Sequence, residues 1–407
     1  MKRIDGGVTA ARGFKASSTA AGLKYKNRDD MALIYSDNPC VCAGTFTTNV
    51  VKAAPVIWDR NIVESGNTVN AIVINSGIAN ACTGKQGLDT CALEAREVAA
   101  GLGIEPSAVL VCSTGVIGAG MPQDKLQNGI KALCPKLSDS LEAGTAAERA
   151  IMTTDTRPKE VAFSFEIGGK TVRIGGMCKG SGMIHPNMCT MLAFITTDAA
   201  ISKQMLTKAL REDVPDSFNM ISIDGDTSTN DTALVLANGQ AGNPLIDSPG
   251  ADYETFAKAL HAVTVFLSKR IAEDGEGATA LFACRVTGAD TKENARTLAK
   301  SVICSSLTKA MIFGHDCNFG RILCALGYSS VSFDPDNVDL YFEGGGKTIH
   351  IYGGGQALAY SEEEATAVLS QPEVTAVVDM HMGCCGAEAW GCDLSFDYVK
   401  INADYRS

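Results

Sequence analysis

The 407-residue sequence lacks any apolar run of the roughly 18 residues that a helix needs to cross a bilayer. It also lacks a cluster of lysine and arginine that could follow a phosphate backbone, and its formal net charge at pH 7 is -11. The first residues are basic, but no apolar stretch follows them, so we expect no secretory signal. These absences predict a cytoplasmic protein whose partners include neither a membrane nor a nucleic acid.

Cysteine pairs with the spacing of a metal site are missing as well. Fifteen cysteines are spread along the chain, yet no C-x-x-C pair occurs, and neither Cys40 and Cys42 nor Cys384 and Cys385 have zinc-site spacing. An odd number of cysteines in such a long chain favours reduced, mostly buried thiols. We therefore expect no structural metal.

The length and the alternation of patterns predict a large α/β protein. Hydrophobic residues make up 45% and charged residues 20%, which is the balance of a soluble globular chain with one large or two ordinary domains. We find no repeats and no low-complexity tracts. Short apolar runs predict strands at 71–75 and 108–112, and amphipathic periodicity predicts helices at 88–102, 123–133, 146–152, 202–211, 252–274 and 289–306.

Two Gly-Gly-Lys-Thr sequences, around Lys170 and Lys347, invite comparison with a phosphate-binding loop. That loop needs an earlier glycine where this chain has Ser164 and Tyr341. Each sequence also separates two alternating apolar runs, so we interpret both as hairpin turns.

The sequence Asp224-Gly225-Asp226 resembles the start of a calcium-binding loop. The glycine required at its sixth position is Thr229, and Val235 replaces the glutamate at its twelfth. The alternative, a polar turn whose side chains bond the backbone, fits better.

The segment 172–198 carries the chemistry of most interest. A strand leads into a loop with Gly180, Gly182 and Pro186, and a second strand opens at Thr190. A threonine hydroxyl is a poor nucleophile unless a base takes its proton, and an N-terminal threonine has its own α-amino group, with a pKa of about 8, for that purpose. This design requires a cut directly before Thr190. A threonine that opens an apolar strand is also ordinary, so the residues alone leave both interpretations open.

Lys179 to Leu192 reads KGSGMIHPNMCTML, which resembles the self-processing signature of the ornithine acetyltransferase family. The resemblance extends over essentially the whole chain, in the order of the family. The other matching segments are GGVTA (6–10), STGVIG (113–118), TTDT (153–156), DGEGAT (274–279), AWGCDL (389–394) and YVKINADYRS (398–407).

The resemblance implies that the chain cuts itself between Cys189 and Thr190, and that Thr190 is then the nucleophile of acetyl transfer. Thr114 and Gly115 match the oxyanion-hole pair, because a strand-end Thr-Gly can aim a hydroxyl and a backbone N–H at one charge. Without the family, a plain turn at 113–115 would be the simpler interpretation.

Further positions match residues that bind substrate in the family. Among the threonines at 153, 154 and 156, Thr153 aligns best. Glu276, between two glycines, would recognise the ammonium group of ornithine, although a solvated turn residue is the plain alternative. The tail would have to fold back over the pocket. The matching positions are Thr153, Lys179, Thr190, Glu276, Asn402 and Ser407.

The family implies an α/β fold of the self-processing, N-terminal-threonine nucleophile type, with mixed sheets layered with helices. Its two fragments, residues 1–189 and 190–407, would stay together and assemble as an α2β2 heterotetramer. The implied reaction moves acetyl from N2-acetyl-L-ornithine to L-glutamate in arginine biosynthesis. It needs neither metal nor organic cofactor, and acetyl-CoA is a second donor in some relatives.

Some residues depart from the family pattern. Cys189 stands where alanine is usual, and Ile78 replaces an asparagine. His315, Cys317 and Phe319 stand where arginine, proline and tryptophan are commoner. We expect these changes to affect the processing rate, the pocket or a subunit contact rather than the chemistry.

Two rival functions remain open. An N-terminal-nucleophile aminopeptidase on a related fold would pass the acyl group to water instead of glutamate. A non-catalytic amino-acid-binding protein would never cut itself and would bind its ligand without Thr190.

Overall fold

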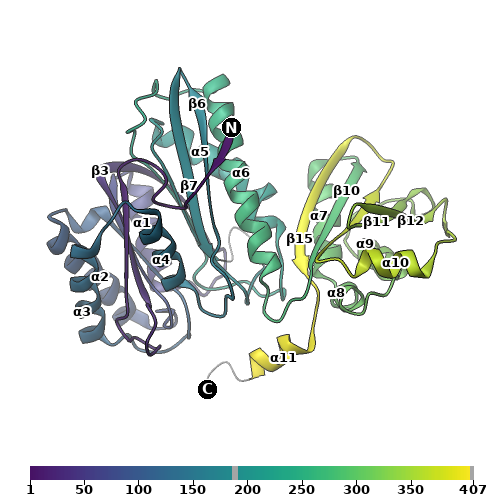
Figure 1. Cartoon of the computed structure of the whole chain (residues 1–407), viewed down its shortest axis with the longest axis horizontal. Coiled ribbons are helices and arrows are strands. Elements are labelled where there is room, and N and C mark those ends of the chain that lie inside the picture. The colour runs from purple at the N-terminus through teal and green to yellow at the C-terminus, as the bar shows by residue number, and fades with distance from the viewer. Residues whose placement is uncertain (186–190, 404–407) are drawn as a thin grey trace. The chain divides into compact units, whose positions relative to one another are not determined.

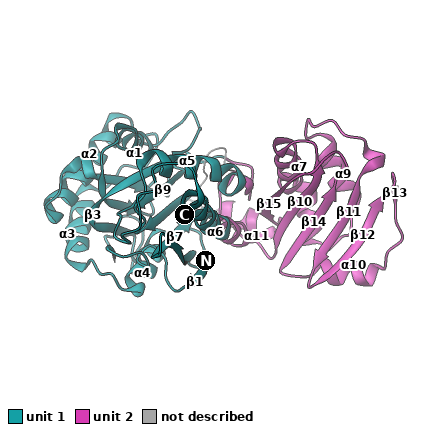
Figure 2. Ribbon diagram, turned by 90° about the horizontal axis from the view of Figure 1, so that it is seen from above, with its two compact units in different colours: residues 1–180, 186–219, 227–267 teal, residues 181–185, 220–226, 268–407 magenta. Residues whose placement is uncertain are grey.

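The computed structural model describes residues 1–185 and 191–403 of the chain. These residues form two compact units (Figure 2). Unit 1 contains residues 1–180, 191–219 and 227–267, and unit 2 contains residues 181–185, 220–226 and 268–403. Because the chain passes between the units several times, neither unit is one continuous stretch of sequence.

The described strands of unit 1 form one mixed sheet in the order β1-β6-β7-β8-β9-β3-β4-β5, with β2 paired to β3. The pairs β4–β5 and β8–β9 are parallel, and the others are antiparallel. The strands are β1 (Lys2–Ile4), β2 (Phe14–Thr19), β3 (Met31–Phe46), β4 (Val69–Asn75), β5 (Val109–Ser113), β6 (Glu160–Ile167), β7 (Lys170–Lys179), β8 (Leu192–Thr197) and β9 (Thr232–Ala237).

Several helices of unit 1 begin and end at residues that cap them. The Ser140 hydroxyl accepts a hydrogen bond from the N–H of Ala143 at the start of α4, and Ser202 caps α5 in the same way. Gly103 ends α2 in the left-handed conformation. The helices are α1 (Ala54–Ser65), α2 (Gly84–Leu102), α3 (Gln123–Leu133), α4 (Leu141–Ile151), α5 (Lys203–Asp213) and α6 (Ala251–Glu273), and α6 continues into unit 2.

Strand β4 shows how the core of unit 1 is built, because every one of its residues is buried. Ala71 and Val73 pack with residues of α2 and α3 on one face of the sheet. Ile72 and Ile74 pack with α1 and α4 residues in the cluster on the other face. Figure 1 shows α2 and α3 side by side beside β3. A strand covered on both faces needs a continuous apolar run, which is the pattern that predicted it.

Unit 2 contains a second mixed sheet, whose described strands follow the order β13-β12-β11-β14-β10-β15 (Figure 2). Its strands are β10 (Leu281–Ala289), β11 (Asp339–Gly344), β12 (Lys347–Gly353), β13 (Gln356–Ala357), β14 (Glu373–Asp379) and β15 (Cys385–Cys392). Its helices are α7 (Lys292–Cys304), α8 (Ser306–Phe313), α9 (Phe319–Gly327), α10 (Glu362–Leu369) and α11 (Phe396–Ala403).

The two faces of this sheet differ in polarity. Val286, Phe342 and Val378 are fully buried in the core of unit 2. Several residues that alternate with them are polar: Arg285 pairs with Glu343 at 3.0 Å and with Glu388 at 3.7 Å. This two-residue period is typical of a sheet covered by helices on one face only.

Both Gly-Gly-Lys-Thr sequences are hairpin turns, as predicted. Gly168 and Gly169, at φ +54° and +73°, join β6 to β7, and Gly345 and Gly346 join β11 to β12 in the same conformation. The predicted helix at 289–306 began too early, because Ala289 is the last residue of β10. The helix α7 starts at Lys292, where the hydroxyl of Thr291 caps it. In the described part of the chain, no helix is long and apolar enough to span a membrane.

Two buried acids in unit 1 link stability to pH. Glu94 on α2 and Asp59 on α1 are inaccessible to solvent, and neither Glu94 oxygen has a hydrogen-bond partner among the described residues. Burial, and then the neighbouring Asp59 carboxyl, raise the pKa of Glu94 to about 8. Burial also raises the pKa of Asp59 to about 8, and the Val111 N–H donates to that carboxyl at 2.7 Å. Both acids are therefore neutral in the folded chain at pH 7.

We expect the free energy of unfolding to fall as pH rises from about 4.5 to about 8, because the unfolded chain releases these protons first. Each acid contributes a slope of roughly 1.4 kcal/mol per pH unit. Thermal unfolding followed by circular dichroism should show a flatter decline for Glu94→Met, while Asp89→Asn, on the exposed face of α2, keeps the wild-type slope. An unchanged slope for Glu94→Met would contradict the assignment of a neutral Glu94.

Candidate active site

The loop after β5 holds the predicted oxyanion pair in a tightly defined conformation. The N–H of Thr114 donates to the Asn75 carbonyl at 3.0 Å, at the end of β4. Gly115 has φ +132°, and a β-carbon on it would lie 2.5 Å from the Gly77 carbonyl oxygen and 2.6 Å from the Ile78 nitrogen. Both obstacles are backbone atoms, so only glycine fits. Thr114 and Gly115 remain partly exposed to solvent.

Asn230 fixes this loop from the turn that precedes β9. Its side-chain amide donates to the Ser113 carbonyl at 2.8 Å and to the Ala79 carbonyl at 2.6 Å. Ile78, which departs from the family pattern, is paired with Thr114 and Val116 through its backbone, and its side chain is buried in the core. The backbone geometry of the loop therefore does not depend on a polar side chain at position 78.

A second cluster joins Thr153 to the end of β7. The buried carboxylate of Asp155 accepts hydrogen bonds from the N–H of Thr153 at 3.0 Å, the N–H of Gly180 at 2.7 Å and the ammonium of Lys159 at 2.6 Å. Burial alone would raise the pKa of the Asp155 carboxyl, but the Lys159 and Lys179 cations hold it well below its usual range. Asp155 is thus a permanent anion that keeps Thr153 close to the Lys179–Gly180 backbone.

Lys179 is also near a second buried carboxyl, that of Asp231, which directly precedes β9. Burial raises the pKa of Asp231 well above its usual range, and hydrogen bonds from Ser228 and the charge of Lys179 oppose this rise only in part. Asp231 is 2% exposed, and its Oδ2 has no hydrogen-bond partner among the described residues. Lys179 therefore lies near two buried acids: Asp155, which is ionised, and Asp231, whose raised pKa favours the protonated form.

Unit 2 brings together two of the predicted substrate residues. The amide of Asn402, on α11, donates to Glu276 Oε2 at 2.7 Å, and Glu276 is 6% exposed. A β-carbon on Gly182 would lie 2.5 Å from Glu276 Oε1, so this glycine leaves the room that the carboxylate occupies. The N–H of Glu276 donates to the Ser181 carbonyl at 2.9 Å. The predicted processing loop and the predicted ammonium receptor are thus in direct contact.

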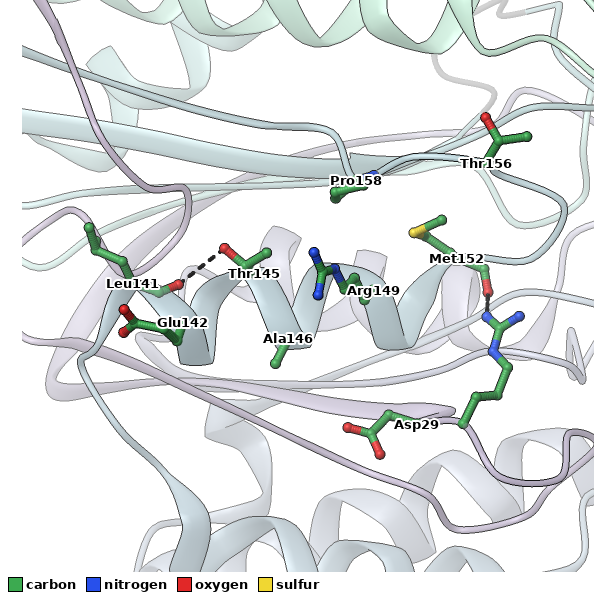
Figure 3. Close-up of a pocket in the computed structure, with 10 residues that line it drawn as sticks. Asp29, Leu141, Glu142, Thr145, Ala146, Arg149, Met152, Thr156 and Pro158 are labelled. Atoms are coloured by element: carbon green, nitrogen blue, oxygen red, sulfur yellow. Dashed lines mark hydrogen bonds between the residues drawn. The ribbon is translucent and has the colours of Figure 1, made fainter.

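A cavity of about 870 Å³ in unit 1 lies along α4 (Figure 3). Arg149 and Glu142 line the cavity from α4, and Met152 and Thr156, which follow the C-terminal end of α4, line it as well. Within the Thr-Thr-Asp-Thr run, Thr153 therefore bonds Asp155 and belongs to its cluster, whereas Thr156 lines the cavity. Both threonines remain candidates for substrate contact.

Comparison with known proteins decides the family. The model of the ArgJ family matches residues 15–407. The chain belongs to the ArgJ family. The arginine biosynthesis bifunctional protein ArgJ of Symbiobacterium thermophilum is 52% identical over 409 residues, which is 100% of each chain. The arginine biosynthesis bifunctional protein ArgJ 1 of Clostridium acetobutylicum is 52% identical over 98% of this chain and 97% of its own.

A solved ArgJ structure has a similar fold. The crystal structure of the arginine biosynthesis bifunctional protein ArgJ of Bacillus halodurans matches with a TM-score of 0.50 and 43% identity. The match covers 52% of this chain and 97% of that one. The predicted family and the predicted α/β class with mixed sheets are confirmed.

The structure distributes the predicted site residues of this ArgJ-family chain between its two units. Thr114, Gly115, Thr153 and Lys179 belong to unit 1, while Glu276 and Asn402 belong to unit 2. The predicted cut at Cys189 and Thr190, and the tail residue Ser407, lie outside the described residues. Among the residues that are described, no group of three or more His, Cys, Asp or Glu is arranged to hold a metal ion.

Sequence reasoning missed Asp155, Asn230 and Asp231. Each is a polar residue buried beside a predicted site residue. Asp155 stands inside the Thr-Thr-Asp-Thr run, and Asn230 and Asp231 follow the polar turn at 224–228. For Asn230 and Asp231, adjacent polar residues just before an apolar strand were the available signal, but the partners of Asn230 come from distant parts of the chain.

Proposed function

We propose that this protein transfers acetyl from N2-acetyl-L-ornithine to L-glutamate through an acetyl-Thr190 intermediate, after it has cut itself between Cys189 and Thr190. It is an enzyme of the ArgJ family, a glutamate N-acetyltransferase of arginine biosynthesis. The observation that carries the proposal is the rigid Thr114–Gly115 loop, because acyl transfer needs donors fixed in advance around a developing oxyanion.

Self-cleavage uses the same hydroxyl as transfer. Thr190 Oγ attacks the carbonyl carbon of Cys189, the C–N bond breaks, and the acyl group moves from nitrogen to oxygen. Water then hydrolyses the ester and leaves a carboxylate on Cys189 and a free α-amino group on Thr190. That amine becomes the base for the second reaction. Because the Cys189 side chain is small, we expect cleavage to proceed, at a rate different from that with the usual alanine.

In the transfer reaction, Thr190 Oγ attacks the acetyl carbonyl of the donor while the α-amino group takes the hydroxyl proton. The hydroxyl of Thr114 and the N–H of Gly115 would donate to the oxyanion. The C–N bond breaks, and the amine of ornithine leaves with the proton. Glutamate then attacks the acetyl ester with its own amine, and Thr190 regains its hydroxyl.

The charges of the predicted binding residues suit the two substrates. The Glu276 carboxylate, oriented by Asn402, would bind the side-chain ammonium of the ornithine donor. The ammonium of Lys179, whose surroundings are organised by Asp155, would bind a substrate carboxylate. Thr153 would contribute a hydroxyl, and Ser407 would close the site from the tail.

No metal or organic cofactor takes part, acetyl-CoA serves as a second acetyl donor, and the protein acts in the cytoplasm. The two fragments, 1–189 and 190–407, form an α2β2 heterotetramer. The matched chain of the Bacillus halodurans structure has about half the length of this one, which supports a chain that divides into two fragments.

The acceptor distinguishes this function from its closest rival. With acetylornithine alone we expect one rapid release of about one ornithine per active site, because the acetyl ester waits for an amine. Added glutamate should then give continuous release with an equal yield of acetylglutamate. Chromatography of the amino acids measures both. Continuous release without glutamate would indicate the aminopeptidase-like hydrolase, and no release at all would indicate a binding protein.

A further inference from the structure

The segment 181–185, which leads toward the predicted cut, is hydrogen-bonded to other residues of unit 2. The Ser181 hydroxyl donates to the Asp274 carbonyl at 2.7 Å. The Ile223 N–H donates to the Ile184 carbonyl at 2.7 Å. His185 Nδ1 lies 3.0 Å from the hydroxyl of Ser222. We call residues 181–185 the anchored arm of the processing loop.

Asp224 makes the most direct contact with this arm. One oxygen of its carboxylate accepts from the Met183 N–H at 2.6 Å, and the other accepts from the Ile184 N–H at 2.8 Å. Met183 is in the left-handed region, at φ +55°, which side chains other than glycine rarely adopt. The two charge-assisted hydrogen bonds therefore hold a backbone conformation that the local sequence does not favour.

The same carboxylate reaches the C-terminal helix. Burial and then the charge of Asp224 raise the pKa of the Tyr398 phenol on α11, and the same helix carries Asn402, whose amide donates to Glu276. Gly277 makes room for this helix, since a β-carbon there would lie 2.7 Å from the Tyr398 nitrogen. Asp224 is thus bonded to the anchored arm and lies near the helix that orients the predicted ammonium receptor.

We propose that Asp224 is a positioning residue with two separable tasks: it sets the anchored arm for self-cleavage through Met183 and Ile184, and it sets α11 for substrate binding through Tyr398. The proposal rests on the self-cleavage and acetyl transfer described under the proposed function. It assigns a role to the Asp-Gly-Asp turn, which the sequence had marked only as a polar turn. Because attack on the Cys189 carbonyl demands one loop geometry, a loosened arm should slow the cut.

The cleavage task is tested by the rate at which precursor disappears. Asp224→Asn keeps the shape of the side chain but turns an amide N–H toward a backbone donor, and Asp224→Ala removes both acceptors. Precursor and fragments are quantified on denaturing gels after synthesis in a cell-free system. We expect cleavage at least about tenfold slower in both variants, since each leaves a backbone donor without its partner. Asp226→Asn, on the exposed side of the same turn, should cleave at the wild-type rate.

The substrate task is tested by Tyr398→Phe, which removes only the phenol hydroxyl of α11 that is influenced by Asp224. This variant should cleave normally, and it should show a KM for acetylornithine several-fold higher with little change in kcat. A merely structural role for Asp224 predicts no such division of effects between the two positions. Circular dichroism shows whether each variant is folded, and Asp224→Asn and Tyr398→Phe keep the test available if Asp224→Ala does not fold.

The possible failures can be told apart. A wild-type chain that never divides overturns the proposed function, and the positioning role falls with it. A wild-type chain that divides, with Asp224→Asn dividing just as fast, overturns the positioning role alone. A KM for Tyr398→Phe equal to that of the wild type overturns the second task.

Discussion

Replacing Thr190 with alanine should leave the chain in one piece and remove nearly all acetyl transfer. The alanine side chain has no oxygen to attack the Cys189 carbonyl, so the peptide bond survives and no new α-amino group forms. The variant then lacks both the nucleophile and its base. Intact-mass measurement should show one polypeptide of 407 residues, and transfer should fall by at least about a thousandfold, as for other lost nucleophiles.

Thr190→Ser is the matched control for that experiment. Serine keeps the hydroxyl and loses only the methyl group, so we expect division into two fragments and measurable transfer, both slower than in the wild type. If Thr190→Ala still divided before residue 190, another residue would be the attacking group. If Thr190→Ala stayed whole but kept full activity, the acyl-threonine intermediate would be wrong.

The second large effect is expected at Gly115. In Gly115→Ala the new methyl group would overlap the backbone of Gly77 and Ile78, neither of which can move without disturbing the end of β4. The loop must shift, and the N–H of residue 115 moves away from the oxyanion. Loss of one oxyanion donor costs roughly a hundredfold to a thousandfold in kcat. We expect a loss of that size in transfer, with a parallel loss in the rate of self-cleavage.

Gly118 provides the control in the same loop. It also has a positive φ, +81°, but a β-carbon on it would meet no atom within 4 Å. Gly118→Ala therefore carries the conformational penalty of a left-handed residue without the overlap. We expect near-normal kcat for Gly118→Ala. Equal losses in the two variants, measured with saturating acetylornithine and glutamate, would show that strain rather than a displaced donor is responsible.

The fold was predictable where its causes are local. The continuous apolar run of β4 predicted a strand buried on both faces, and the Gly-Gly turns before Lys170 and Lys347 predicted two hairpins. The early start assigned to α7 shows the limit. Ala289 suits a helix by its own preference, but pairing with Cys385 on β15 keeps it in a strand. The allocation of the chain to two units could not be predicted, because it depends on long-range packing.

In the candidate site, too, the sequence identified some residues but not the contacts that depend on long-range packing. Glu276 and Asn402 came from the family resemblance, and the structure confirms only that they meet. Asp155 and Asn230 were not predicted, because a carboxylate that accepts from Gly180 and an amide that reaches Ser113 span distances in sequence that no local pattern records. Asp224 was interpreted as a turn residue, and it is one; its hydrogen bonds to Met183 and Ile184 became visible only in the folded chain.

The most direct test of the account is to trap the acyl group. The purified enzyme is mixed with acetylornithine without glutamate, stopped in acid within the first turnover, and analysed by mass spectrometry of its fragments and peptides. We predict that the fragment beginning at Thr190 gains the mass of one acetyl group, located on its first residue and lost again when glutamate is added before the acid. An active enzyme that carries acetyl elsewhere, or that transfers it with the 189–190 bond intact, would contradict the account.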